Sequence, residues 1–292
     1  MKIADLAVLA ARQLPRQHGD SMQYVRPLSN VGILRHHRPT SFEAAIYDPV
    51  VILILQGRKE TLLGADSYPM GVGECLLVSH DLPVIARVTK TPYLALIFDV
   101  ELDTLRELYE NLTEPLPSAA QARALAVHEC SGQLVDALHR CLALSKSRMD
   151  AAVLGPLVSR EIHYRLATAP FGGMLRELIR HESHSSAIAR AIAQLRRDFR
   201  TPLEVPQLAR SVGMSASSFH KHFKAITASS PLQYRKSLQL LEARRLLRSG
   251  TRSVTEVAFD IGYESAAQFS RDFSRKFGSS PKHDVPTSRE RR

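Results

Sequence analysis

Two stretches in the last third of the chain place hydrogen-bonding and basic side chains on one face of a predicted helix. In each stretch a serine is followed by phenylalanines four and eight residues later, a spacing that puts both rings on one helix face. The serine and rings are Ser215, Phe219 and Phe223 in the first stretch, and Ser265, Phe269 and Phe273 in the second. The opposite face of each helix is mostly polar or basic, which suits contacts with base edges and phosphates. The outward residues are Ala216, Ser217, His220, Lys221 and Lys224 in the first stretch, and Ala267, Gln268, Ser270, Arg271 and Arg275 in the second.

A short helical pattern ending at a glycine, Gly213 or Gly262, precedes each of these serines. Glycine ends a helix in the left-handed conformation without a Cβ clash, and serine is a good N-cap for the next helix. This order predicts a helix-turn-helix motif, written twice, whose second helix faces the bases in the major groove. The offset between the copies rises from 49 to 50 residues at the serine, so we expect a second turn one residue longer.

The segment between the two motifs predicts a helix that is apolar on two sides and can therefore pack against both. Its stripes are Tyr234, Leu238 and Leu241, and Leu240, Ala243 and Leu247. Arg244 and Arg245 on this helix contact phosphates or simply keep the helix soluble. We also expect phosphate contacts from Ser215 and Ser265, at the starts of the two reading helices.

The positive charge of the chain is concentrated around these motifs. The formal net charge is +10, and residues 184–292 hold 20 Lys and Arg against 9 Asp and Glu, whereas the rest of the chain is nearly neutral. Such asymmetry predicts a module that binds a polyanion, joined to a part with another role. Together with the duplicated motif, it favours binding to double-stranded DNA.

The two motifs, the helix between them and the "SSP" that closes each copy resemble the DNA-binding domain of the AraC/XylS family of bacterial transcription regulators. The resemblance covers residues 186–286 and implies a seven-helix domain that reads two successive major grooves. The base-reading positions it implies are Ser217, His220 and Lys221, and Ala267, Gln268, Ser270 and Arg271. Two positions depart from the family pattern: Gln239 stands where an arginine is usual, and Ala266 where a proline often follows the motif serine.

The front of the chain predicts a β-rich domain followed by helices. Short apolar runs separated by turn residues predict a small antiparallel β-barrel or jelly roll over residues 21–100, and helical patterns follow over residues 101–180. With a helical segment at residues 1–20 and a basic tail at 287–292, the fold class is α+β, ending in an all-α DNA-binding domain. The phrases "LILQGRKETLLG" and "LLVSHDLPV" resemble the cupin-like effector domain of one AraC-family branch.

That resemblance implies a ligand-modulated regulator, an activator, whose barrel holds an unidentified small-molecule effector. The polar stretch at residues 181–186 is expected to join the effector domain to the DNA-binding domain. RNA polymerase is the expected protein partner. No effector-binding residue can be named from the sequence.

The helices after the barrel allow two interpretations. The stripe Leu134, Leu138, Cys141 and Leu142 could pair with the same helix of a second subunit, giving a homodimer. It could equally cover the edge of the barrel in its own subunit.

The remaining features argue against catalysis. A metal-dependent cupin enzyme fused to a DNA-binding domain is the alternative, but His36 and His37 are adjacent and His80 stands alone, so we expect no metal, cofactor or catalytic residue. A DNA-repair fusion would need clustered cysteines. Cys75, Cys130 and Cys141 instead predict core thiols, or a redox sensor, in a reducing cytoplasm. No apolar run approaches membrane-spanning length.

Overall fold

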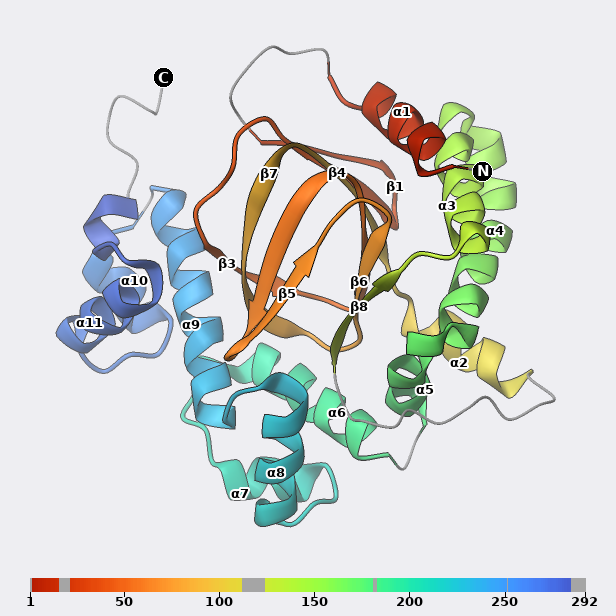
Figure 1. The fold of residues 1–292 in the computed structure, drawn as a ribbon. Coiled ribbons are helices and arrows are strands. Elements are labelled where there is room, and N and C mark those ends of the chain that lie inside the picture. The colour runs from red at the N-terminus through yellow and green to blue at the C-terminus, as the bar shows by residue number, and fades with distance from the viewer. Residues whose placement is uncertain (1, 16–21, 112–123, 181–182, 251, 285–292) are drawn as a thin grey trace. The chain divides into compact units, whose positions relative to one another are not determined.

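A computed structural model describes residues 2–15, 22–111, 124–180, 183–250 and 252–284. By its internal contacts the chain divides into two compact units. The first unit consists of Met1–Phe42 and Ile46–Ser186, and the second of Ala187–Arg292 with Glu43–Ala45. The first is a β-sheet with helices and the second is built on helices, so the predicted α+β class is confirmed (Figure 1).

The first unit contains one eight-stranded sheet that curves around an interior (Figure 1). Its main path runs β1-β2-β7-β4-β6-β8, while β3 pairs with β7 and β5 pairs with β4. The long strands β4 and β7 are antiparallel, from Val50 opposite Asp99 to Leu62 opposite Ile85. The strands are β1 (Gln23–Leu28), β2 (Val31–His36), β3 (Glu43–Tyr47), β4 (Val50–Leu63), β5 (Asp66–Met70), β6 (Glu74–Val78), β7 (Leu82–Asp99) and β8 (Leu125–Glu129).

Strand β8 corrects the expectation that residues 101–180 are entirely helical. It pairs antiparallel with β6 and extends the sheet, with Leu125 opposite Val78. Its five residues are too few to show a clear strand period between helical segments. The flanking elements are α2 (Leu102–Glu110), α3 (Gly132–Ala143), the 3-10 turns η1 (Leu144–Lys146) and η2 (Pro170–Gly172), α4 (Arg148–Thr168) and α5 (Gly173–Ile179).

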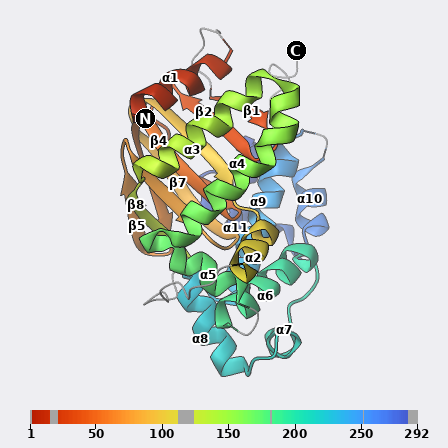
Figure 2. The same ribbon diagram turned by 90° about the vertical axis from the view of Figure 1, so that its right-hand side faces the viewer.

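One face of the sheet packs against helices. Alternate strand residues such as Leu53 and Leu96 join Leu6 of α1 (Ile3–Gln13) and Leu138 of α3 in one buried cluster. Figure 2 shows α3 and α4 lying across this face. Because side chains alternate along a strand, the residues between them, such as Tyr93, point to the other face. The N-terminal segment predicted to be helical, residues 1–20, contains α1. Its residues 16–20 lie outside the described part.

The stripe Leu134, Leu138, Cys141 and Leu142 lies inside this same cluster, at 2% exposure or less. These side chains are already buried against other residues of their own subunit. The prediction that they pair with a second subunit is therefore wrong. The second interpretation holds: α3 covers the sheet of its own subunit. A sequence cannot distinguish the two uses, because both need the same apolar spacing.

The polar stretch at residues 181–186 ends where the two units divide, between Ser186 and Ala187, but its last residues are already helical. Residues 181–182 lie outside the described part, but α6 (His184–Asp198) already begins at His184. Ser185 and Ser186 are buried, and the Ser183 hydroxyl accepts a hydrogen bond from the Ser186 amide at 2.9 Å. Serines that cap and pack a first helical turn look like a polar loop in the sequence.

The second unit continues with helices that carry both predicted motifs. They are α7 (Val205–Ser211), α8 (Ala216–Thr227), α9 (Pro231–Arg248), α10 (Val254–Asp260), α11 (Ala266–Phe277) and the 3-10 turn η3 (Pro281–Asp284). With α6, the described part of this unit has six α-helices and one 3-10 turn, whereas the family resemblance implies seven helices. The predicted basic tail at 287–292 lies outside the described residues.

Candidate nucleic-acid interface

The first helix-turn-helix consists of α7, a four-residue turn and α8. Gly213 in the turn has φ +77°, the left-handed conformation that glycine adopts without strain. The Ser215 hydroxyl then caps α8 by accepting a hydrogen bond from the Ser218 amide at 3.3 Å. These contacts fix the angle at which α8 leaves the turn.

Two phenylalanines hold α8 against its neighbours. Phe219 and Phe223 are 0% exposed, with ring centroids 5.4 Å apart. The Phe223 ring also meets the Tyr234 ring of α9 edge to face, at 5.5 Å. Because this face is buried, the opposite face of α8 is the one presented to solvent.

The second helix-turn-helix consists of α10, a five-residue turn and α11, so its turn is one residue longer, as the offset predicts. The Ser265 hydroxyl caps α11 by accepting a hydrogen bond from the Gln268 amide at 3.4 Å. Phe269 and Phe273 are 0% exposed and 5.5 Å apart. The two motifs are thus built alike around their phenylalanine seams.

The second turn is held by contacts that the sequence did not reveal. Gly262 has φ +85°, and a Cβ placed there would lie 2.1 Å from the Arg200 carbonyl oxygen. The buried Gln239 of α9 donates a hydrogen bond from Nε2 to the Ile261 carbonyl at 2.9 Å. Gln239, one of the two departures from the family pattern, therefore supports the turn from within.

The structure places most of the predicted reading residues on exposed surface. Ser270 is half-buried, and its hydroxyl donates to the Ala266 carbonyl of its own helix at 2.9 Å. The exposed positions are Ser217, His220, Lys221 and Lys224 on α8, and Ala267, Gln268, Arg271 and Arg275 on α11. Each reading helix therefore presents a polar and basic face opposite its buried rings.

An acidic residue that was not predicted links the middle of α11 to its neighbours. The buried Asp272 carboxylate lies 2.7 Å from Nζ of Lys236 in α9 and accepts a hydrogen bond from the Tyr263 hydroxyl at 3.2 Å. Arg275 pairs with the other carboxylate oxygen. Burial and the nearby carboxylate raise the pKa of Tyr263, which keeps its proton on this hydrogen bond. The sequence hinted at this cluster only through the spacing of Asp272 and Arg275, which lie three residues apart and can pair on one helix face.

The two arginines predicted to contact phosphates differ in their surroundings. Arg244 Nε lies 2.8 Å from the Asp284 carboxylate, and its guanidinium covers the Phe277 ring. Arg245 pairs with Glu242 but keeps 67% of its side chain exposed. Arg244 therefore holds η3 in place, whereas the Arg245 side chain stays accessible, and its predicted phosphate contact remains a prediction.

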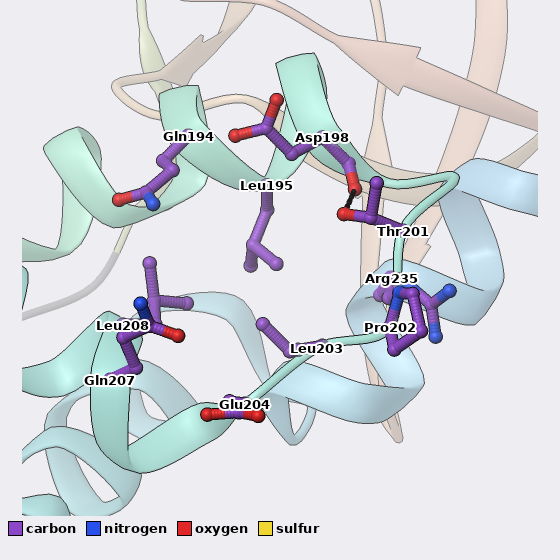
Figure 3. A pocket seen from close by; sticks show the side chains of 10 residues that line it. All are labelled: Gln194, Leu195, Asp198, Thr201, Pro202, Leu203, Glu204, Gln207, Leu208 and Arg235. Carbon is purple, nitrogen blue, oxygen red and sulfur yellow. Dashed lines mark hydrogen bonds between the residues drawn. The ribbon is translucent and has the colours of Figure 1, made fainter.

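A small cavity of about 160 Å³ lies between α6 and α7 in the second unit (Figure 3). The Thr201 hydroxyl donates to the Asp198 carbonyl at 2.8 Å beside it, and Arg235 of α9 closes one side. Sites for drug-sized ligands usually measure about 300–1,000 Å³. This cavity is too small for such a ligand and supports no effector site in the DNA-binding unit.

The interior of the sheet holds buried polar groups in the first unit. The Tyr93 hydroxyl and the Thr61 hydroxyl are buried, and neither has a hydrogen-bond partner among the described residues. Burial raises the pKa of Tyr93 to about 12. Within the described ranges, no three His, Cys, Asp or Glu side chains gather as metal ligands would. In those ranges, no helix combines the length and apolarity needed to cross a membrane.

Two helix-turn-helix motifs on one basic helical unit define a class of DNA-binding proteins, and comparisons with known proteins place the chain within that class. Residues 27–174 match the AraC-type transcriptional regulator N-terminus, and residues 208–284 match a helix-turn-helix domain. The chain belongs to the AraC family of transcriptional regulators. The resemblance stated from the sequence is thereby confirmed.

Individual relatives differ in how much of the chain they match. The virulence regulon transcriptional activator VirF of Yersinia enterocolitica is 22% identical over 78% of this chain and 86% of its own. The activator RhaS of Escherichia fergusonii is 33% identical over 35% of this chain and 36% of its own. The match to the regulator CdhR of Pseudomonas aeruginosa, 29% identical over 45% of this chain, spans only 37% of that protein.

Among solved structures, ToxT of Vibrio cholerae in its unsaturated fatty acid-bound form aligns over 92% of this chain and 96% of its own. The TM-score is 0.59 at 11% sequence identity. At that identity the alignment shows a shared fold: an N-terminal sheet domain with helices, followed by a helical DNA-binding domain.

Proposed function

We propose that this protein is a sequence-specific transcriptional regulator whose subunit reads two successive major grooves, one with α8 and one with α11. The observation that carries the proposal is the duplication itself. Each helix buries two phenylalanines and presents hydrogen-bonding and cationic side chains on its opposite face. Such a face supplies both base contacts and phosphate contacts. VirF and RhaS are both named activators, so we propose activation, with RNA polymerase as the protein partner.

The experiment that tests this proposal compares selected with random DNA. One subunit should protect two major grooves about 34–36 Å apart on one face of the duplex. Lys221→Ala and Arg271→Ala should each weaken binding to the selected site by about 1–3 kcal/mol and relax specificity at one position. Arg245→Ala should weaken all sequences alike and reduce the salt dependence.

Arg106→Ala is the matched control, since it removes one exposed positive charge from α2 in the other unit. It should leave the affinity for both DNAs unchanged. Equal losses on selected and random DNA for Lys221→Ala and Arg271→Ala would refute base reading by these residues. A footprint confined to one groove would refute the two-helix arrangement.

We further propose that a small-molecule effector binds inside the sheet of the first unit. A buried hydroxyl without a hydrogen-bond partner costs about 1–3 kcal/mol of stability. A polar ligand that accepts or donates hydrogen bonds at the Thr61 and Tyr93 hydroxyls would remove this cost, which favours its binding. A thermal-shift screen of metabolites should find a compound that raises the melting temperature. Thr61→Val with Tyr93→Phe should abolish that shift while DNA binding without the compound persists. A shift that survives both changes would place the effector elsewhere.

We propose no catalytic step, because the relatives are regulators rather than enzymes. We also propose that the regulator acts as a homodimer. Its interface is not the α3 stripe, which is buried within the subunit.

A further inference from the structure

A buried carboxylate stands on one of the two helices that are proposed to read DNA. Asp272 lies in the middle of α11 and is only 5% exposed. Acidic side chains are almost never buried unless they are paired, and a carboxylate is repelled by the phosphates of DNA. An acid at this position therefore lowers the affinity for DNA unless its contacts offset the repulsion.

The Asp272 carboxylate joins three elements of the second unit. One oxygen lies 2.7 Å from Nζ of Lys236 in α9 and accepts a hydrogen bond at 3.2 Å from the Tyr263 hydroxyl, in the turn before α11. The other oxygen pairs with the guanidinium of Arg275, three residues further along α11. One buried anion thus restrains two cations, one on each of two helices.

Both cations keep part of their surface accessible. The Lys236 side chain is 43% exposed and the Arg275 side chain is 76% exposed. An ammonium carries three N–H donors and a guanidinium five, so each can donate to a phosphate while it keeps its contact with Asp272. Arg275 stands in the last turn of α11, beyond the N-terminal residues of a recognition helix that contact base edges. Its position therefore suits the DNA backbone.

We propose that Asp272 is a positioning residue, which holds Lys236 and Arg275 in one orientation and thereby makes DNA binding more selective. The inference rests on the proposed reading of DNA by α11 and adds a residue that determines its specificity. On the preferred site, base contacts fix α11 in the groove, and the restrained cations meet phosphates in a single register. On random DNA no base contacts fix the helix, and only mobile cations could follow phosphates that lie elsewhere.

The restraint affects the two kinds of DNA unequally. Ordering two long side chains on binding costs conformational entropy, and this cost is avoided when they are held in place beforehand. On the preferred site this advantage offsets the repulsion between the carboxylate and the DNA. On random DNA the repulsion remains and the fixed geometry gives no advantage, so Asp272 lowers that affinity.

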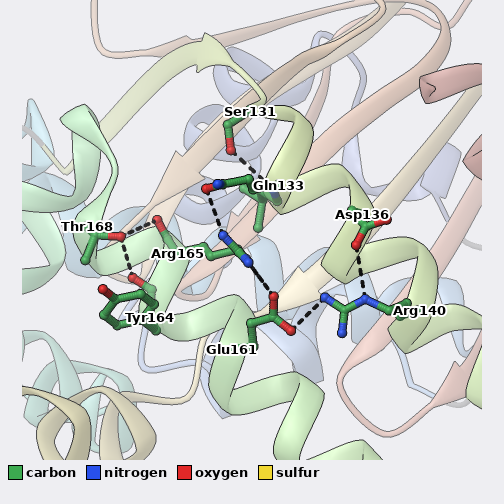
Figure 4. Close-up of polar contacts among 9 residues, drawn as sticks. Ser131, Gln133, Asp136, Arg140, Glu161, Tyr164, Arg165 and Thr168 are labelled. Carbon is green, nitrogen blue, oxygen red and sulfur yellow. Dashed lines mark hydrogen bonds and ion pairs between the residues drawn. The ribbon is translucent and has the colours of Figure 1, made fainter. Parts of the chain in front are cut away.

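The first unit contains a similar cluster, with one carboxylate between two cations (Figure 4). Glu161 of α4 accepts hydrogen bonds from Arg140 of α3 at 2.7 Å and from Arg165 at 2.8 Å. Arg165 also donates to the Gln133 side chain of α3 at 2.8 Å. This cluster fastens α4 to α3 and belongs to neither reading motif, so it provides a matched control.

The test measures the affinity of the full-length protein for selected and random DNA over a range of salt concentrations. Asp272→Asn keeps the size of the side chain and an acceptor for the Tyr263 hydroxyl but removes the charge. It should raise the affinity for random DNA at least about threefold and steepen the salt dependence by about one phosphate contact. The affinity for the selected site should not rise, so the ratio of the two affinities should fall at least about threefold.

Two controls separate this effect from the loss of a charge in general. Glu161→Gln removes the same charge from between two cations in the first unit and should change neither affinity. Asp260→Asn removes it from α10 in the second unit, where the carboxylate lies 2.7 Å from Arg252. It should change both affinities by the same factor and leave their ratio unaltered.

A triple variant identifies the groups that cause the gain on random DNA. Adding Lys236→Gln and Arg275→Gln to Asp272→Asn should abolish that gain, because the released cations produce it. A ratio of affinities that Asp272→Asn leaves unchanged overturns the proposal. A gain on random DNA that persists in the triple variant overturns it as well.

A measurement on the wild type keeps the proposal falsifiable if Asp272→Asn fails to fold. Nitrogen NMR of arginine side chains should show that the Arg275 guanidinium rotates more slowly than that of Arg271, which lies one turn earlier on the same face of α11. Equal rotation rates would show that Asp272 does not restrain Arg275 and would overturn the proposal.

Sequence preference separates this inference from the proposed function. A wild type that binds selected and random DNA equally, with a slowly rotating Arg275, would refute the sequence-specific regulator while the restraint by Asp272 still held. A wild type that prefers selected DNA, and keeps the same preference in Asp272→Asn, would do the reverse.

Discussion

His80 shows how one buried side chain can make the first unit sensitive to pH. Its Nε2 lies 3.1 Å from the Ser185 carbonyl, which can only accept, so the neutral ring carries its proton there. Its Nδ1 faces the Ser79 hydroxyl at 2.9 Å. Burial lowers the pKa of His80 from 6.5 to about 4, and the hydrogen bond to Ser185 only partly offsets this.

We therefore predict that the free energy of unfolding of the first unit falls as the solution is acidified below about pH 6.5. Between about pH 6.5 and pH 4 the unfolded chain binds a proton at His80 and the folded chain does not. The contribution of His80 to the free energy of unfolding is therefore complete above pH 6.5 and is lost as the pH falls to about 4. Between pH 7 and pH 5 the loss from His80 alone is about 2 kcal/mol. Urea unfolding at the two pH values measures it.

His80→Gln is the control, because it keeps a hydrogen-bonding side chain that cannot titrate. Its stability should change less between pH 7 and pH 5 than that of the wild type. An identical pH dependence in both proteins would contradict the account. The buried His163, whose pKa is also lowered by burial, contributes in the same direction to both.

The sequence predicted the outward residues of the reading helices better than the residues that support them. Lys221 and Arg271 follow from helical spacing, because a period of 3.6 residues fixes which side chains oppose a buried ring. Gln239 and Asp272 do not, because their partners, Ile261 and Lys236, lie on other elements. The spacing of residues along one helix shows which side chains share a face. It does not show which other element packs against that face.

At the scale of the element, the two turn glycines share a conformation but differ in their surroundings. Gly213 has φ +77° with no heavy atom within 4 Å of an added Cβ, whereas at Gly262 that atom would lie 2.1 Å from the Arg200 carbonyl oxygen. We predict that Gly213→Ala costs about 1–2 kcal/mol of stability from backbone strain. Gly262→Ala should cost clearly more, because the backbone at Arg200 must also move.

Chemical unfolding of the two variants, with DNA binding measured in parallel, checks this difference. Gly213→Ala should retain operator binding near the wild-type affinity, while Gly262→Ala should lose most of it. Equal stabilities for the two variants would contradict the close approach at Arg200.

The phenylalanine seam of the second motif gives another prediction for an element. Phe269→Ala should cost about 3–5 kcal/mol, because it leaves a cavity beneath α11. Phe259→Ala on α10 is the matched control: its ring is 55% exposed, so the change should stay within about 0.5 kcal/mol. Melting curves and operator affinity should fall together for Phe269→Ala alone. A stable Phe269→Ala would show that the ring does not support the helix.

The elements that the sequence placed wrongly share a physical reason. Apolar spacing predicted α3 but left open whether Leu138 faces a second subunit or the sheet of its own subunit. The structure shows that Leu138 packs against its own sheet. Strand β8 depends on an edge offered by β6, far away in the chain. Pairing partners set strands more strongly than local propensity does.

For the whole molecule, we predict that the two units fold when separated. Residues 1–186 keep Ser185 beside His80 and should form a dimer that binds no DNA. Residues 183–292 keep α6 whole and should bind one half-site with nearly the affinity of the intact protein. On a site with two half-sites the second fragment should bind about a hundredfold more weakly, because it lacks the avidity of a dimer.

Light scattering and DNA titration of both fragments measure these outcomes. A monomeric first fragment would remove the avidity argument. A second fragment as tight as the full chain on the double site would show that the first unit contributes nothing to operator binding.

The unequal turns of the two motifs also have a consequence for promoter architecture. With four residues in one turn and five in the other, and different side chains on α8 and α11, the two halves of a subunit are not interchangeable. The stretch of DNA that one subunit occupies therefore has a head and a tail. We therefore expect that flipping that stretch in place reverses the bound subunit along the DNA, and that its orientation matters for the neighbouring gene.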